Sequence, residues 1–230
     1  MLKQFGQDIW TADGPNVTGA LGFHFPTRMA VIRLAGGEVF VWSPTALTDE
    51  LRTSVDELGP VRHIVAPNSL HHTFLADWKR AYPAAQIHAA PGLKAIRNDI
   101  AFDSELGDAP NPAWAGDVDQ AAVRGNRITT EIVFFHRPSH TAIFTDLLQQ
   151  YPKGWFRGWR GVIAKLDGMT GTAPAVPQKF RTAFADRAAA RTALRRILAW
   201  PTEKVLMAHG PPVTTDGAAF LAHAFAWLKP

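Results

Sequence analysis

The chain has 230 residues, of which 47% are hydrophobic and 19% are charged, which is enough apolar material for one sizeable core. It contains no cysteine, which excludes disulfides, thiolate metal sites and a cysteine nucleophile. No apolar run approaches the roughly 18 residues of a membrane span, and the first residues lack the apolar segment of a secretory signal. We therefore expect a cytoplasmic protein without a membrane partner, in which any metal is bound by His, Asp or Glu.

The net charge of +4 and the pI of about 9.6 indicate a mildly basic surface. Nucleic-acid binding requires clustered Lys and Arg. The nearest approach to such a cluster is KGWFRGWRG (Lys153–Gly161), where aromatic and basic residues alternate. A partly buried loop with arginines that extend to solvent explains this segment more simply, so we do not expect a nucleic-acid partner.

The first half of the chain alternates strands and helices. Two apolar runs around Gly36 and Gly37 predict a hairpin over Arg28–Pro44. Leucine and valine at helical spacing predict a helix over Leu47–Gly59, with Thr48 as its N-cap. The next predicted elements are a buried strand, a helix and a second strand: Val61–Pro67, His72–Pro83 and Ala85–Leu93. This order indicates helices packed on a sheet.

The second half begins with a polar stretch, Phe102–Gly125, that we expect to be mainly loop. Another segment rich in Gly, Pro and Trp, Tyr151–Arg181, predicts a long ordered loop that serves as a lid or substrate wall. Three strands are predicted, at Ile128–Pro138, Thr141–Leu148 and Glu203–Gly210. Two helices are predicted, at Asp186–Trp200 and Thr215–Leu228, and the second is capped by Thr215 or Asp216. No repeat or linker divides the chain, so we expect one domain over residues 1–230.

Polar residues follow three of the predicted strands. His71 and His72 follow the strand that ends at Pro67, Asp146 lies at the end of another, and His209 ends the last. Strand ends are where sheets build binding sites, and three histidines with one carboxylate form a nitrogen–oxygen shell suited to zinc, iron or manganese. The alternative is that the histidines are polar residues of a strand-to-helix turn, that Asp146 is an N-cap, and that His209 bonds a backbone carbonyl.

Two further residues are candidates for the same site. His140 lies between the predicted strands Ile128–Pro138 and Thr141–Leu148 and is an additional candidate ligand. Asn68 precedes the two histidines and is a candidate donor that orients a ligand. His136 is expected to be a surface residue at a strand end.

Three segments carry a resemblance to a known family. They are VAPNSLHHTFLADWKRAYP, FFHRPSHTAIFTDLL and VLMAHG. Their order resembles that of the metallo-β-lactamase superfamily, and more narrowly a branch known only as a domain of unknown function. The resemblance covers roughly Ile32 to Leu228. It implies an α/β (α+β) fold, a four-layer αββα sandwich of two mixed β-sheets flanked by helices.

The resemblance also implies a reduced metal site. When His72 is set on the last histidine of the family's His-x-His-x-Asp-His loop, His71 falls on its aspartate, and Pro67 and Ser69 fall on its first two histidines. His140 would then remain from the first metal site without its partners. The implied state is therefore mononuclear or metal-free; a single divalent ion, zinc or alternatively iron or manganese, would be held by His71, His72, Asp146 and His209.

Besides a nucleic-acid-processing or -binding role, which the basic pI and WFRGWRG suggest, two functions remain open at this point. The first is a metal-dependent hydrolase-like protein with one metal site, acting on an unidentified small molecule such as an ester, thioester, lactone or phosphodiester. The second is a non-catalytic binding or scaffold protein that kept the fold and lost the dinuclear site. Metal content distinguishes them.

Overall fold

The computed structural model describes residues 1–230, which form eleven strands and seven α-helices. The strands are β1 (Lys3–Gly6), β2 (Ile9–Thr18), β3 (His24–Arg33), β4 (Val39–Trp42), β5 (Val61–Ala66), β6 (Gln86–Ala89), β7 (Ser104–Glu105), β8 (Val118–Val123), β9 (Glu131–His136), β10 (Thr141–Gln149) and β11 (Lys204–His209). The helices are α1 (Asp49–Asp56), α2 (Leu75–Ala81), α3 (Leu93–Ile96), α4 (Trp159–Leu166), α5 (Gln178–Ala183), α6 (Arg187–Leu198) and α7 (Gly217–Phe225). Short 3-10 turns lie at Ala20–Gly22 and Ala226–Leu228.

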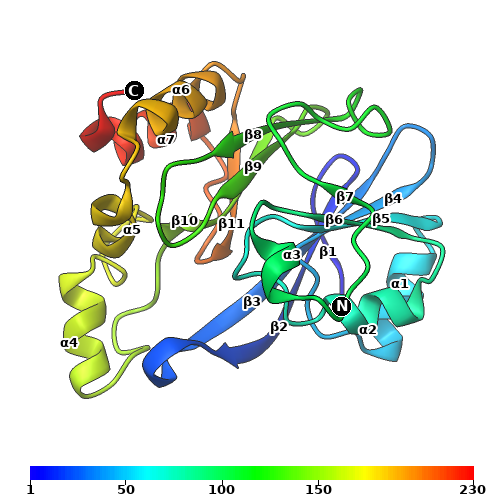
Figure 1. The fold of residues 1–230 in the computed structure, drawn as a ribbon, viewed down its shortest axis with the longest axis horizontal. Helices are drawn as coiled ribbons and strands as arrows, with labels where there is room; N and C mark the ends of the chain where they lie inside the picture. The colour runs from blue at the N-terminus through cyan, green and yellow to red at the C-terminus, as the bar shows by residue number, and fades with distance from the viewer.

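The strands form two mixed sheets that pack face to face, with helices on the outer faces (Figure 1). One sheet has seven strands in the order β1-β2-β3-β4-β5-β6-β7, and the other has four in the order β11-β10-β9-β8. In the first sheet β1 to β4 are antiparallel, and β4 to β7 are parallel. In the second, β10 and β11 are parallel and the other pairs antiparallel. The predicted four-layer αββα sandwich is confirmed.

Alternation along the strands divides the core into layers. Ile32 and Phe40 point into the space between the sheets, where they join residues of the second sheet such as Phe134. Their neighbours Val31 and Val41 point the other way and pack under α1 and α2. This is the two-residue period of a strand that is buried on both faces. The outer face of the four-stranded sheet packs on α5, α6 and α7 in a third cluster.

Most predicted elements of the first half are confirmed. The hairpin is β3 and β4, and Thr48 caps α1 by accepting a hydrogen bond from the Leu51 backbone N–H over 3.2 Å.

The final helix, α7, begins after Asp216, but no side chain caps it, so the predicted capping by Thr215 or Asp216 is wrong. Asp216 adopts a left-handed conformation with φ of 54°, which turns the chain into the helix without a side-chain bond.

The two expected loops contain regular structure. Phe102–Gly125 holds β7 and the buried strand β8, which pairs along its whole length with β9. Asp119 and Gln120 within this strand obscured the apolar pattern. Tyr151–Arg181 holds α4 and most of α5, and α4 exposes most of its apolar side chains and buries Ala164. None of the helices has the length and apolar character needed to cross a membrane.

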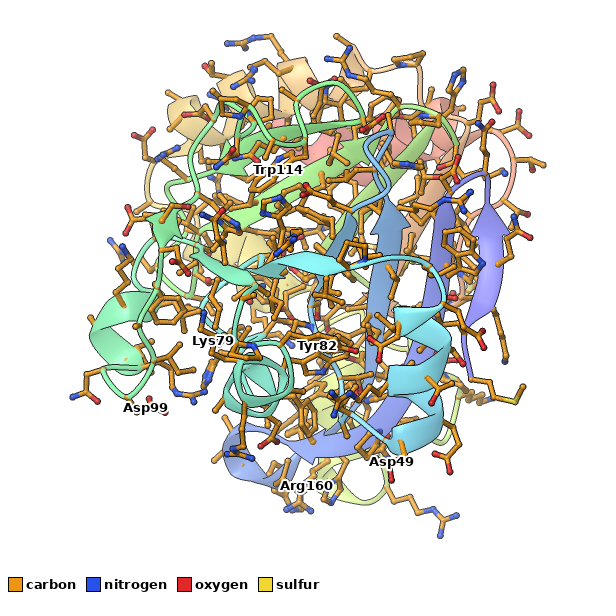
Figure 2. The ribbon with its side chains drawn as sticks, turned by 90° about the vertical axis from the view of Figure 1, so that its right-hand side faces the viewer. Asp49, Lys79, Tyr82, Asp99, Trp114 and Arg160 are labelled. Carbon is orange, nitrogen blue, oxygen red and sulfur yellow. The ribbon has the colours of Figure 1, made fainter.

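His63 on β5 and His88 on β6 form a buried pair that packs against the inter-sheet core. His63 Nδ1 lies 3.1 Å from His88 Nε2, and both rings contact Trp114 edge-on. Trp114 lies at the far end of the molecule from Arg160 (Figure 2). Burial, and then the neighbouring His63, lower the pKa of His88 to about 4. Burial also lowers the pKa of His136, which is fully buried rather than at the surface as expected, to about 4.

These depressed histidine pKa values predict loss of stability in acid. An unfolded histidine takes up a proton near pH 6.5, whereas the folded His88 and His136 remain neutral to about pH 4. The free energy of unfolding is therefore retained above pH 6.5 and falls as the pH drops from 6.5 toward 4, by about 1 to 2 kcal/mol per histidine at pH 5. Urea unfolding of metal-free protein at pH 7.5 and pH 5 checks this. A His88→Gln/His136→Gln variant should lose less between the two pH values, and an equal loss would contradict the assignment.

Candidate metal centre

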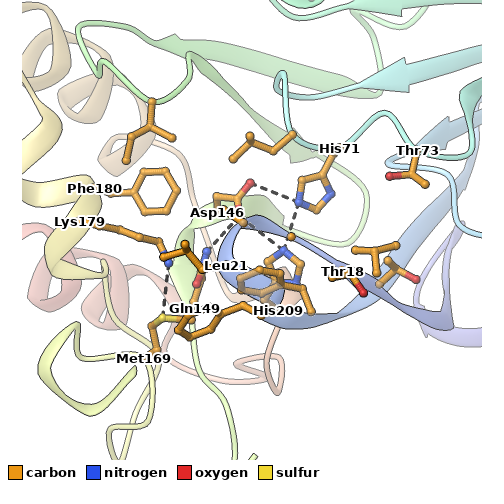
Figure 3. A pocket seen from close by; sticks show the side chains of 18 of the residues that line it. Thr18, Leu21, His71, Thr73, Asp146, Gln149, Met169, Lys179, Phe180 and His209 are labelled. Atoms are coloured by element: carbon orange, nitrogen blue, oxygen red, sulfur yellow. Dashed lines mark hydrogen bonds and ion pairs between the residues drawn. The ribbon is translucent and has the colours of Figure 1, made fainter. Parts of the chain in front are cut away.

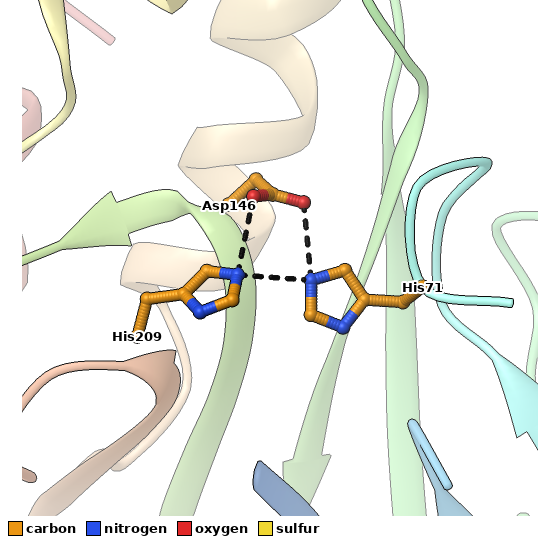
Figure 4. Close-up of side chains that lie close together, drawn as sticks. All are labelled: His71, Asp146 and His209. Atoms are coloured by element: carbon orange, nitrogen blue, oxygen red, sulfur yellow. Dashed lines mark hydrogen bonds and ion pairs between the residues drawn. The ribbon is translucent and has the colours of Figure 1, made fainter. Parts of the chain in front are cut away.

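Three side chains from three different elements meet at one edge of the two sheets (Figure 4). The Nε2 atoms of His71 and His209 lie 3.2 Å apart. Asp146 places one carboxylate oxygen on each ring, with Oδ2 at 3.3 Å from His71 Nε2 and Oδ1 at 3.5 Å from His209 Nε2. The three potential ligand atoms all lie within 4.8 Å of one another. Asp146 and His209 are buried and His71 is nearly so, which makes this a preformed, largely desolvated cluster.

His71 is held by the turn that follows β5. The side chain of Asn68 accepts hydrogen bonds from the backbone N–H groups of Leu70 and His71, at 2.9 and 3.0 Å, which folds the chain back on itself. The same side chain donates to Asp146 Oδ2 over 2.7 Å. Asn68 is fully buried, so all of these bonds form away from water. One amide therefore fixes the position of the histidine and of the carboxylate together.

Asp146 lies on a bulge in β10. The pairing of β10 with β11 shifts between Phe144 and Gln149, so the residues between them leave the ladder. The buried carboxylate of Glu131 accepts the freed backbone N–H groups of Thr145, Asp146 and Leu147, at 2.7, 2.9 and 3.0 Å. Without this acceptor the bulge would bury three unpaired donors. Glu131 thus stabilises the backbone that aims Asp146 at the histidines.

His209 is held at the end of β11 by the other sheet. Arg28 on β3 donates to the carbonyl of Met207 over 3.0 Å and also to that of Gly210, on either side of His209. The His209 carbonyl accepts the Gln150 N–H over 2.8 Å. Gly210 allows this approach, because it has φ of +141° and an added Cβ would lie 2.9 Å from the Gln150 carbonyl oxygen.

The hydrogen-bond partner of each histidine Nδ1 determines whether the Nε2 of the same ring is free to bind a metal. His209 Nδ1 lies 2.9 Å from the Pro26 carbonyl, which can only accept, so Nδ1 carries the proton. In the neutral ring, Nε2 therefore presents its lone pair to the cluster. His71 Nδ1 lies 2.7 Å from the Ser43 hydroxyl, and Ser43 is itself held in a left-handed conformation with φ of 50°. An oriented Nδ1 partner and a lone pair on Nε2 are typical of metal-binding histidines.

The electrostatics of the cluster favour the ionised form of Asp146. Burial alone would raise the pKa of Asp146, but His71 and His209 together hold that pKa well below its ordinary value. Burial lowers the pKa of His209, although Asp146 opposes this shift. Burial, with the nearby charge of Asp146, raises the pKa of Glu131 to about 7. A negative oxygen that faces two ring nitrogens is a donor set that matches a divalent cation.

The structure does not bring the other predicted ligands into the cluster. His72, set beside His71 in the predicted ligand set, turns the other way: its carbonyl accepts a bond from Arg97 over 2.8 Å, and its Nδ1 lies 3.1 Å from the same guanidinium. His140 is about half exposed and lies 2.9 Å from Glu203. The predicted four-residue set thus becomes three residues. Asn68 lies where an orienting donor was expected.

Three residues of the site carried no usable signal in the sequence. Ser43, which contacts His71, reads in the sequence only as the end of a strand. Gln149 donates to Asp146 Oδ1 over 3.0 Å from the far side of the bulge. Glu131 reads as an ordinary residue at the start of a strand. Their contacts depend on the bulge in β10 and on the approach of the two sheets, which spacing along the chain does not reveal.

The cluster lies at the base of a cavity of about 870 Å³ (Figure 3). Its walls are mainly apolar and come from the β2–β3 turn, α4 and the segment that follows it, including Phe23, Phe25, Ile163, Met169 and Phe180. Lys179 reaches the cavity, but its ammonium pairs with Asp167 over 3.2 Å and lies over Phe25 and Phe180. Gln149 also lines the cavity and keeps its buried Oε1 without a partner. The size is that of a small-molecule site.

The fold is that of the metallo-β-lactamase superfamily. A metallo-beta-lactamase from Pontibacter korlensis is 13% identical, with a TM-score of 0.65 over 100% of this chain and 98% of that one. The metallo-beta-lactamase FIM-1 from Pseudomonas aeruginosa, solved in a mono-zinc form, is 13% identical, with a TM-score of 0.64 over 100% and 96%. The metal-soaked Flv1 flavodiiron core from Synechocystis sp. PCC6803 is 14% identical, with a TM-score of 0.65 over 100% and 60%.

Within this fold the chain belongs to the family described as Domain of unknown function (DUF4336), whose model matches residues 6–156. The match ends before β11 and therefore includes His71 and Asp146 but not His209. No curated protein matches the chain.

Substitution of Gly210 tests how tightly the end of β11 is held. Gly210→Ala forces a side chain into the left-handed region and against the Gln150 backbone, so we expect a loss of about 3 kcal/mol in the free energy of unfolding. Gly92→Ala is the matched control, because Gly92 has φ of +88° but open space around it. It should cost about 1 kcal/mol. Equal losses in urea unfolding would mean that the close approach to Gln150 contributes nothing.

Proposed function

We propose that this protein is a metal-dependent hydrolase with one divalent ion held by His71, Asp146 and His209, acting on a small substrate that carries an apolar group. The observation that carries the proposal is the convergence of two Nε2 atoms and a carboxylate at the base of an apolar cavity. The chain shares its fold with metallo-β-lactamases, and one of these, FIM-1, has been solved in a mono-zinc form. A single ion is thus compatible with the fold.

Three protein ligands suit catalysis better than the four expected from the sequence. A zinc ion with four protein ligands is closed, whereas three leave a coordination position for water or substrate. A divalent ion there would supply Lewis acidity and lower the pKa of a water molecule bound in the open position. Zinc fits the donor set, and two histidines with one carboxylate also suit iron or manganese.

The residues around the cluster have separate tasks in this proposal. Ser43 and the Pro26 carbonyl orient the two imidazoles, and Asn68 and Gln149 hold the two oxygens of Asp146. The apolar walls exclude water from the base of the cavity, which strengthens every charge interaction there.

The cavity walls indicate the substrate class. The ammonium of Lys179 is neutralised by Asp167. Lys179 therefore offers no free positive charge to a highly anionic substrate such as a nucleotide. Aromatic and aliphatic side chains instead offer contact to a hydrocarbon group. We therefore favour esters, thioesters or lactones of apolar acids over phosphodiesters.

Metal content separates this proposal from the scaffold hypothesis. Protein purified without a histidine tag should contain about one metal per chain by elemental analysis. His71→Ala and His209→Ala should lose it, because each removes one of three ligands. His72→Ala and His140→Ala are matched controls that should keep it, since neither ring reaches the cluster. No metal after reconstitution with zinc, iron and manganese would favour the scaffold hypothesis, and loss in His72→Ala would contradict the ligand set.

Substrate chain length tests the role of the apolar walls. For p-nitrophenyl esters from acetate to octanoate, kcat/KM should rise by about two- to fourfold per methylene, as each is buried in the cavity. Removal of the metal by a chelator should abolish the hydrolysis, and added zinc should restore it. Val17→Asn places an amide in the wall and should flatten the series. A rate that falls with chain length, or that persists in His209→Ala, would refute the assignment.

A further inference from the structure

Exposed apolar side chains are concentrated around one end of the molecule. Ten large hydrophobic residues are exposed in the whole chain. Five of them also line the cavity, namely Leu21, Leu70, Ile128, Ile163 and Leu166, and three more, Trp155, Trp159 and Val162, lie on the same segment as α4. Clustered exposure of this kind marks an interaction surface, because single exposed hydrophobic residues are normally scattered.

The exposed side chains of α4 belong to a firmly packed structure. Trp155 donates from Nε1 to the His24 carbonyl over 3.0 Å, and the Trp159 ring packs edge-on against Phe23. Arg160 donates to the Leu21 carbonyl over 2.9 Å. These contacts join α4 to the β2–β3 turn, and the two lie side by side in both views of the molecule (Figures 1 and 2). We call the exposed residues Leu21, Trp155, Trp159, Val162, Ile163 and Leu166 the α4 platform.

The segment that carries the α4 platform is positively charged up to Asp167, and Asp167 itself pairs with Lys179. The segment from Tyr151 to Leu166 contains four basic residues, Lys153, Arg157, Arg160 and Lys165, and no acidic residue. None of the four forms an ion pair, whereas Arg33, Arg97 and Arg137 elsewhere each pair with an aspartate. Four unneutralised cations beside exposed tryptophan, valine, isoleucine and leucine match the composition of a surface that enters the headgroup region of an anionic bilayer.

We propose that the α4 platform docks on a membrane surface that contains anionic lipid, with the cavity mouth facing the bilayer. Leu21, Ile163 and Leu166 belong both to the platform and to the cavity wall, so the platform surrounds the entrance. The exposed apolar side chains insert among the headgroups, and the four cations contact lipid phosphates. The earlier expectation of no membrane partner rested on the absence of a spanning segment, whereas this contact is peripheral. It does not depend on the metal or on hydrolysis.

Vesicle co-sedimentation tests the proposal with the full chain, in the presence of chelator so that the result is independent of the proposed function. The protein should bind vesicles of phosphatidylcholine with 30% phosphatidylglycerol, bind pure phosphatidylcholine far less, and be released by added salt. Arg157→Glu/Lys165→Glu should weaken binding by about tenfold or more. Trp159→Ser/Leu166→Ser should weaken it comparably through the lost apolar contact.

Matched controls distinguish the α4 platform from a general effect of charge or hydrophobicity. Arg187→Glu/Arg195→Glu reverses two exposed charges on α6, and Ile96→Ser removes an exposed apolar residue outside the cavity; both should bind as the parent chain does. Because all these positions are exposed, urea unfolding should show each variant folded. No binding to either vesicle, or equal binding by the platform variants and the parent, would overturn the proposal. So would a dimer or a single-stranded RNA complex that the platform variants abolish in the absence of vesicle binding.

Discussion

The hydrogen bond from Asn68 to Asp146 joins the two sheets at the point where the candidate metal centre forms. Asn68 follows β5 of the seven-stranded sheet, and Asp146 lies on β10 of the four-stranded sheet. The same amide fixes the turn that carries His71, so the distance between histidine and carboxylate is set by a single buried side chain. A buried amide of this kind has no water to replace a lost partner, which makes the geometry depend on all of its bonds forming together.

The remaining supports of the site follow from the same approach of the sheets. Arg28 reaches from β3 to the backbone on either side of His209, and Glu131 accepts the N–H groups that the bulge in β10 sets free. Each support satisfies backbone groups that would otherwise be unpaired. The site is therefore a consequence of how the sheets close on each other, and the metal would bind to positions that the protein already holds.

The sequence predicted the strands that carry the site because each is an apolar run followed by a polar residue. Asp146 and His209 could be selected in this way, and the resemblance supplied their order. The sequence could not separate His71 from His72, because the two are adjacent and only the turn made by Asn68 decides which ring points inward. It could not find Ser43 or Glu131, whose roles depend on a left-handed residue and a bulge. α4 was read as loop because it is short and lies in a segment rich in Gly, Pro and Trp.

The cavity and the α4 platform extend the account from the centre to the surface. The cluster lies at the base of an apolar cavity, and the walls of the cavity continue into exposed side chains with unpaired cations beside them. Under the two proposals, such an arrangement would bring a poorly soluble substrate from a lipid surface to a preorganised polar centre without passage through water.

The most direct test of the central claim is anomalous diffraction at the zinc absorption edge from a crystal of the zinc-loaded protein. The account predicts one strong peak within about 2.0 to 2.2 Å of His71 Nε2, His209 Nε2 and an Asp146 carboxylate oxygen. A peak bound by His72 or His140, or no peak at this cluster in zinc-loaded crystals, would contradict it.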